Sequence, residues 1–315
     1  MSRIKVGIAL SLKHTGSNSW KKLIESIQRC EELGYYSVGI GDHLTSGPIG
    51  SRLEAWTVLS ALAAITSKIK LSPMVICNNF RPPSLLAKMA ATLDVISSGR
   101  LEFAIGAGWN ETEHIAYGLH YPNLQERIAR LSETLDICRR MWVEEKSSYL
   151  GKYYEIHNAV CEPKPVQKPY PPIMVGGAAK STLRTVAKNA NIWNWSGSPE
   201  DYSKKLKVLK RYCSKEGRDF GEIEKSYFSN ISAVYGEKEL KQFLKPNYVE
   251  RRLNVSLEDY IKNIKTRSLL GTPDEIMEKI KAYEMLGVTY FILHIIDWEI
   301  RDTLKTMMDE VFTKL

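Results

Sequence analysis

The feature that most constrains this chain of 315 residues is a regular alternation of strand-like and helix-like segments. Short runs of β-branched and apolar residues recur eight times, and a segment with helical periodicity follows each run. The expected strands occupy residues 4–10, 36–41, 69–76, 101–106, 173–176, 191–195, 224–235 and 289–296. Eight strand–helix units make a (β/α)8 TIM barrel, so the chain is predicted to be an α/β protein with one domain over residues 1–315.

The joins between segments agree with a parallel sheet. Gly34 and Gly287 each end a helical segment, and an apolar strand follows each of them at once. The run over residues 289–296 is continuously apolar apart from His294, as expected for a strand that is buried on both faces. In that setting His294 is expected to be a hydrogen-bonded core residue. A doubly wound open sheet is the alternative architecture, because it uses the same alternation.

Two stretches interrupt the alternation. Residues 144–172 are rich in Tyr, Pro and Lys and have no clear period, and residues 236–271 are highly charged and partly helical. Both stretches are longer than ordinary connections between elements. They are therefore expected to be excursions that run over a face of the barrel.

Charge and cysteine usage exclude several classes of protein. The 44 Lys and Arg exceed the 36 Asp and Glu by eight, but the basic residues form no aromatic-interleaved patch, so no nucleic-acid partner is expected. A moderately basic surface can still attract an anionic cofactor or substrate. The five cysteines show no CxxC or Cys/His ligand spacing, which predicts reduced thiols, a cytoplasmic location and no metal site. No apolar run approaches the roughly 20 residues of a membrane-spanning helix, so no membrane association is expected.

Function in a barrel is carried at the carboxyl ends of the strands, and Asp42 and His43 follow the second expected strand. A carboxylate beside an imidazole suits proton transfer, because histidine titrates near neutral pH. The same pair is also compatible with a loop in which the two side chains only cap the next turn.

Two glycine-containing turns follow the fourth and fifth expected strands. Glycines in residues 106–109 allow a ligand to approach the backbone closely, and Trp109 either stacks on a planar ring or covers the core. Glu113 and His114 lie just beyond and could face the same mouth. Residues 176–178 open a helix, and they either bind an anion through backbone N–H groups or form only a tight turn.

Several segments together resemble the signature of the bacterial luciferase-like superfamily. They comprise residues 86–101, 106–109, 113–118, 126–142, 151–154, 163–165 and 171–177. The chain is similar to the compact branch of F420-dependent oxidoreductases. The similarity covers most of the first 200 residues and is specific as a series, whereas the last 80 residues match only loosely.

This resemblance implies a (β/α)8 barrel that binds coenzyme F420 or, alternatively, FMN, and that forms a homodimer. Asp42 and His43 match the Asp–His pair of F420-dependent members, in which the histidine contacts the substrate and acts in proton transfer. A non-prolyl cis peptide bond that buttresses the deazaflavin is implied near Met74 and Val75. The cofactor-binding residues expected on this basis are Asp42, Met74, Val75, Asn78, Gly106, Ala107, Gly108, Trp109 and, around the phosphate, Gly176, Gly177 and Ala178.

The chain departs from these relatives at two places. Trp109 stands where some F420-dependent members have an acidic residue directly after the glycine turn. Residues 191–195 form a bulkier run than the family's common sequence there, which would reshape the substrate pocket.

Three functions follow from the residues and the resemblance. The first is an F420-dependent oxidoreductase that transfers a hydride between C5 of the deazaflavin and a small organic substrate. In it His43 and Asp42 are the catalytic residues: His43 exchanges the proton, and Asp42 either orients it or contacts the ring. The second is a monooxygenase that uses reduced FMN and O₂ and depends on a flavin or F420 reductase partner. The third is a non-catalytic flavin-binding barrel.

Overall fold

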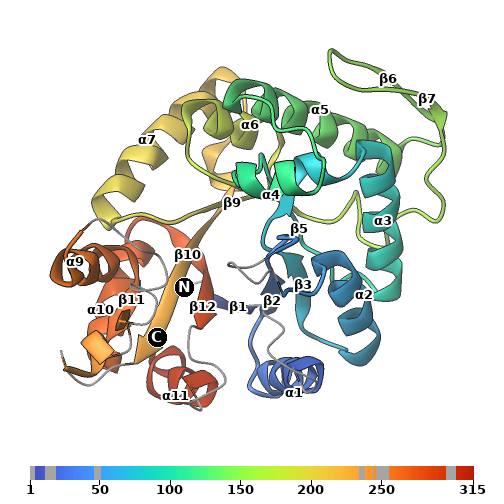
Figure 1. Ribbon diagram of the computed structural model, residues 1–315. Helices are drawn as coiled ribbons and strands as arrows, with labels where there is room; N and C mark the ends of the chain where they lie inside the picture. The colour runs from blue at the N-terminus through green and yellow to red at the C-terminus, as the bar shows by residue number, and fades with distance from the viewer. Residues whose placement is uncertain are drawn as a thin grey trace.

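Parallel strands form a ring whose outer side is covered by helices in this computed structural model, which describes residues 4–10, 19–45, 51–233, 238–242, 244–245, 255–295 and 303–315 (Figure 1). The order of the strands in the sheet is β3-β2-β1-β12-β10-β9-β8-β5-β4. The strands are β1 (Lys5–Leu10), β2 (Ser37–Ile40), β3 (Lys70–Pro73), β4 (Ile76–Cys77), β5 (Phe103–Gly106), β8 (Ile173–Gly176), β9 (Ile192–Trp195), β10 (Glu224–Ala233) and β12 (Val288–Ile295).

The ring closes because β3 and β4 are two parts of one segment. β3 pairs with β2, β4 pairs with β5, and β1 pairs with both β2 and β12. With β3 and β4 taken as one strand, the described part of the barrel has eight parallel strands in chain order, which confirms the predicted (β/α)8 fold. A short strand that the sequence did not reveal, β11 (Leu269–Gly271), adds to β10. The expected strand ends at residues 234, 235 and 296 lie outside the described residues.

The helices follow the strands as predicted, with local signals at their ends. Thr272 and Glu275 form the two reciprocal hydrogen bonds of a capping box at the start of α10, and Ser198 caps α7. The α-helices are α1 (Ser19–Glu32), α2 (Ala55–Ile65), α3 (Pro83–Ile96), α4 (Glu111–Ala116), α5 (Leu124–Val143), α6 (Lys180–Asn189), α7 (Pro199–Lys215), α9 (Leu257–Arg267), α10 (Pro273–Glu284) and α11 (Thr303–Glu310). Short 3₁₀ turns are η1 (Asn78–Phe80), η2 (Phe220–Glu222) and η3 (Phe312–Lys314).

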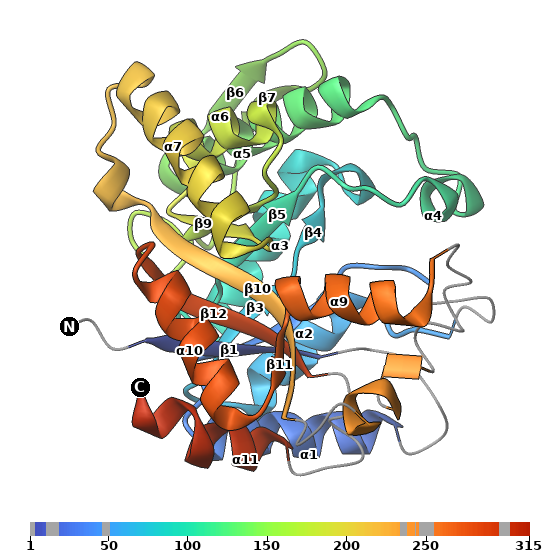
Figure 2. The same ribbon diagram turned by 90° about the vertical axis from the view of Figure 1, so that its left-hand side faces the viewer.

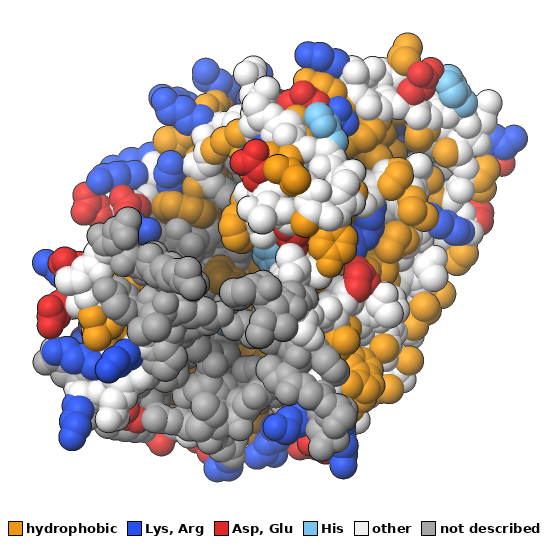
Figure 3. All heavy atoms as spheres, in the orientation of Figure 1, with side chains coloured by type: hydrophobic (Ala, Val, Ile, Leu, Met, Phe, Trp, Pro, Cys, Tyr) orange, Lys and Arg blue, Asp and Glu red, His pale blue; other side chains and the backbone are white. Residues whose placement is uncertain are grey.

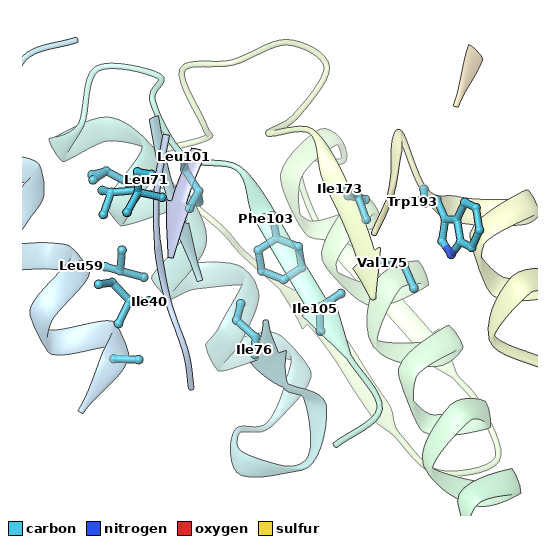
Figure 4. Packing of buried hydrophobic residues seen from close by; sticks show 14 of the residues in the cluster. Ile40, Leu59, Leu71, Ile76, Leu101, Phe103, Ile105, Ile173, Val175 and Trp193 are labelled. Atoms are coloured by element: carbon cyan, nitrogen blue, oxygen red, sulfur yellow. The ribbon is translucent and has the colours of Figure 1, made fainter. Parts of the chain in front are cut away.

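The buried apolar side chains form two layers, because alternate residues of each strand face opposite sides of the sheet. The larger layer lies between strands and helices and includes Phe103, Val175 and Trp193, on β5, β8 and β9 (Figure 4). A smaller cluster fills the barrel itself and includes Ala9 and Met174. Trp193 packs against Tyr202 of α7, so the bulk of residues 191–195 lies toward the helix layer rather than in the predicted substrate pocket.

The two interruptions contain regular structure that their sequences did not reveal. Within residues 144–172, β6 (Ser147–Leu150) and β7 (Glu155–Ala159) form an antiparallel hairpin beside α5 (Figures 1 and 2). Within residues 236–271, the described part includes α9, which lies beside α10 (Figure 2). A search of the described helices finds none that combines the length and apolar character needed to cross a membrane.

Candidate active site at the carboxyl end of the barrel

A cavity of about 160 Å³ opens where β2, β4 and β5 end. It brings together most of the residues that the sequence singled out after the second, third and fourth strands. The lining residues are Asp42, His43, Met74, Val75, Ile76, Cys77, Phe80, Gly108, Trp109, Asn110, Glu113 and His114.

The break between β3 and β4 shapes the floor of this cavity. The Met74–Val75 peptide bond is cis, at the position implied by the family resemblance, and Pro73 ends β3 just before it. Val75 lies between Gly106 and Gly176: a Cβ on Gly106 would lie 2.9 Å from Val75 Cγ2, and one on Gly176 would lie 3.4 Å from Val75 Cγ1. Glycine at position 106 is therefore required for β5 to pass Val75 at this distance.

His43 is held by a carboxylate from α4. Its Nδ1 lies 2.9 Å from Oε2 of Glu113, whose side chain is 1% exposed. The other oxygen of Glu113 accepts hydrogen bonds from the backbone N–H groups of Leu44 and Thr45. Because an ionised carboxylate can only accept hydrogen bonds, the proton of this contact lies on Nδ1, which leaves Nε2 for proton exchange. On its other side, His43 meets the 71%-exposed Trp109 edge to face, with ring centroids 5.4 Å apart.

Asp42 serves a different group from the one expected. Its carboxylate accepts two hydrogen bonds from the Arg81 guanidinium, at 2.7 and 3.0 Å, and a third from the backbone N–H of Cys77 at 2.9 Å. Arg81 also reaches Glu54, which caps α2. Burial alone would lower the pKa of Arg81, but Asp42 and Glu54 raise it overall. Of the two roles expected for Asp42, the orientation of His43 is corrected, because the partner of the imidazole is Glu113 and Asp42 binds Arg81. A contact of Asp42 with the cofactor ring stays a prediction.

His114 faces the same cavity but holds the loop together. Its Nδ1 lies 2.7 Å from the carbonyl oxygen of Asn110, which can only accept, so Nε2 accepts from the Cys77 thiol 3.5 Å away. Burial raises the pKa of Cys77 to about 12, which keeps the sulfur protonated.

Two further positions have unpaired hydrogen-bonding groups. Asn78 is fully buried, and among the described residues its Oδ1 has no partner. A buried amide oxygen without a donor is rare in folded proteins, so this atom can accept a hydrogen bond from a ligand N–H.

At the second position, α6 begins after Ala179 without a side-chain cap, which leaves its first N–H groups available to an anion. Gly177 makes the turn there, with φ +119° and its own N–H bonded to Asn194.

His294 lies away from the first cavity. Its Nδ1 is 3.0 Å from Oδ1 of Asn230, so it is hydrogen-bonded as expected. It is not enclosed in the apolar core, however, because it lines a second cavity of about 330 Å³ at the ends of β9, β10 and β12.

Sequence reasoning did not find Arg81 or Glu54, and it named Glu113 without assigning it a role. Arg81 and Asp42 are 39 residues apart, and Glu113 and His43 are 70 apart. Only its position in the sequence could have pointed to Glu113. It follows Trp109 by about one helical turn, which keeps its side chain near the mouth of the barrel.

Comparison with known proteins finds relatives that align with most of this chain. The model of the luciferase-like monooxygenase family matches residues 4–246. An F420-dependent glucose-6-phosphate dehydrogenase of Microbacterium testaceum (strain StLB037) is 28% identical over 317 residues, which cover 92% of this chain and 91% of that protein. The coenzyme F420-dependent tetrahydromethanopterin reductase of Methanopyrus kandleri has a TM-score of 0.82 at 21% identity, with 99% of each chain covered. Monooxygenase RslO1 of Streptomyces bottropensis has a TM-score of 0.82 at 22% identity, again with 99% of each chain covered.

Proposed function

Because this chain belongs to the luciferase-like monooxygenase family and is an oxidoreductase, we propose that it uses coenzyme F420 to transfer a hydride to or from a small organic substrate. The observation that carries this proposal is the His43–Glu113 pair in the cavity at the carboxyl end of the barrel. The F420-dependent relatives, which align over nearly the whole chain, favour this cofactor.

In this proposal the ring of the cofactor packs against Val75, which lines the cavity and which Gly106 and Gly176 allow to lie close to β5 and β8. Oδ1 of Asn78, buried just after β4, has no partner among the described residues and is an acceptor near this strand end. The uncapped start of α6, after residues 176–178, suits the phosphate of the cofactor tail. When bound, the deazaflavin supplies the hydride chemistry at C5, while the protein supplies position and electrostatics.

In this proposal His43 exchanges the proton that accompanies hydride transfer. Glu113 is a positioning residue, because its carboxylate fixes the proton on Nδ1 and holds the ring in one orientation. Trp109 packs edge to face on the imidazole and covers it on the side toward solvent. The Arg81–Asp42 pair anchors the strand end from which His43 projects.

The first experiment is an equilibrium titration of the purified protein with F420 and, separately, with FMN, followed by fluorescence. Tight F420 binding with weak FMN binding supports the proposal, and the reverse preference contradicts it. His43→Ala should then lower turnover by on the order of 10²–10⁴ with nearly unchanged F420 affinity. His157→Ala, at a 75%-exposed histidine on β7, is the matched control and should have no effect. Equal losses of turnover and F420 affinity in His43→Ala would assign the histidine to cofactor binding instead.

A second candidate is an FMN-dependent monooxygenase. Trp109 favours it, because this chain has an indole where some F420-dependent members carry an acid–base side chain. The fold likeness to monooxygenase RslO1 is as high as that to the F420-dependent reductase. Oxygen consumption in the presence of FMN and a flavin reductase would identify this activity.

We also propose a homodimer in the cytoplasm. Apolar side chains lie exposed along α2 and α3, where Ile65 is 40% exposed, Leu85 52% and Ile96 49%. Figure 3 shows apolar side chains gathered on the side of the molecule where these helices lie. Sedimentation of the wild type and of Leu85→Asp would test this face, since a charge in a dimer interface should give monomers.

A further inference from the structure

The guanidinium of Arg52 lies at the inner side of the barrel mouth. A Cβ on Gly39 would meet the barrel-interior residues Met74 and Ala9, so position 39 of β2 faces inward. Gly41 lies just beyond the end of β2. A Cβ on Gly41 would lie 3.0 Å from Nη2 of Arg52, 3.6 Å from the Met74 carbonyl oxygen and 3.8 Å from Cδ2 of His43. Arg52 and the imidazole therefore both pack beside Gly41, next to the Met74–Val75 peptide.

Most of the donors of Arg52 have no partner within the part of the chain that the structure describes. Among the described residues its hydrogen bond runs from Nη2 to the Gly41 carbonyl oxygen at 3.0 Å, and its buried Nε has no partner. Burial lowers the pKa of Arg52, while the charges of Glu113 and Asp42 oppose that shift. The side chain stays cationic, because guanidinium does not deprotonate in proteins.

Neither neighbouring carboxylate pairs with Arg52. Asp42 receives three hydrogen bonds from Arg81 and Cys77, and Glu113 receives three from His43 and the two backbone N–H groups that follow it. Arg52 is half-buried, and its buried Nε has no partner among the described residues, so beside two satisfied carboxylates it is one half of an ion pair. An oxyanion from outside the chain would complete it.

We propose that Arg52 binds the carboxylate of the substrate. A guanidinium recognises a carboxylate through two parallel N–H donors, and the His43 imidazole lies beside the same glycine as Arg52. The substrate class that fits both groups is a small carboxylate with a hydroxyl or carbonyl on the adjacent carbon. Arg52 then meets the carboxylate while His43 meets the adjacent oxygen. This assignment of substrate class rests on the proposed function, whereas anion binding by Arg52 can be tested without it.

The test is isothermal titration of the purified protein with oxalate, a small dianion that carries no hydride. Wild type, Arg52→Gln, Arg52→Lys and the surface control Arg140→Gln, on α5, are compared. Arg52→Gln should weaken oxalate binding by roughly tenfold or more, because it removes charge-assisted hydrogen bonds. Arg52→Lys should lose less, since it keeps the charge but not the fork, and Arg140→Gln should bind as wild type does.

Thermal unfolding of each variant verifies that it is folded, and an F420 titration separates the roles. Unchanged oxalate affinity in both Arg52 variants overturns the proposal. So does a loss of F420 affinity in Arg52→Gln without a loss of oxalate affinity, because Arg52 would then be a cofactor ligand. Oxalate binding that depends on Arg52, in a protein that exchanges no hydride with F420, would overturn the proposed function and leave the anion site standing.

Discussion

Replacing Asp42 by Asn removes one of the two carboxylate oxygens that hold the Arg81 guanidinium. The amide keeps one acceptor, but it turns an NH₂ group toward an N–H donor where the second oxygen was. Both partners are largely buried, with side-chain exposures of 3% for Asp42 and 12% for Arg81. The change therefore leaves a buried cation with fewer acceptors.

The size of the effect follows from these contacts. Breaking a buried ion pair by removing one partner costs about 3–5 kcal/mol. Arg81 retains its 2.6 Å contact with Glu54, and Asn retains one oxygen, so the lower limit of about 3 kcal/mol applies. In a chain of this length 1 kcal/mol moves the unfolding midpoint by roughly 2 °C, which predicts a fall of about 6 °C.

Equilibrium unfolding of Asp42→Asn, Arg81→Gln and the double variant gives the coupling directly. Because both single changes break the same pair, the double variant should lose about 1–3 kcal/mol less than the sum of the two. Asp136→Asn is the control, since its pair with Arg139 lies at the surface and should contribute at most about 1 kcal/mol. The reasoning is refuted if Asp42→Asn unfolds like the wild type but loses most of its F420 affinity, because Asp42 would then serve the cofactor.

Three other changes test the site and the barrel. Glu113→Gln should lower kcat by on the order of 10² with nearly unchanged KM, because the amide no longer holds the proton of His43 on Nδ1. The pH profile of kcat should change as well, and an unaltered profile would argue for a merely structural role of Glu113. Gly106→Ala should weaken F420 binding by roughly tenfold or more, because the new methyl must displace Val75; equal affinity would place the ring elsewhere. Burial raises the pKa of Glu102, so the folded protein keeps that proton to higher pH than the unfolded chain and loses stability as pH rises through this range. Glu102→Gln should therefore gain stability relative to wild type, on the order of 1 kcal/mol, as pH rises above the ordinary pKa of a glutamate, and a pH-independent difference in urea unfolding would contradict this.

The residues themselves determined the barrel and the general place of the site. Apolar runs of strand length alternate with helical periods, and that pattern depends on local burial, so it can be recognised without knowledge of contacts. Capping signals such as Thr272 and Glu275 act over one helical turn and were equally recognisable. Asp42, His43 and the glycines of residues 106–108 come at strand ends, where a barrel places its site. The hairpin of residues 147–159 was not predicted from the sequence. Its strands are short and mostly not buried, so they lack a clear apolar period.

Only the tertiary structure decided which polar groups meet. Asp42 and His43 are neighbours in the chain, yet one turns to Arg81 and the other to Glu113, because successive residues at a strand end leave it in different directions. Periodicity reports which side of an element is buried, but it does not report which distant side chain comes within hydrogen-bond distance. Hydrogen bonds and ion pairs require an approach within about 3 Å, so the packing of β2, β4 and β5 selected Glu113 and Arg81 as partners. The same packing placed Arg52 beside Gly41, where its Nη2 donates to the Gly41 carbonyl oxygen.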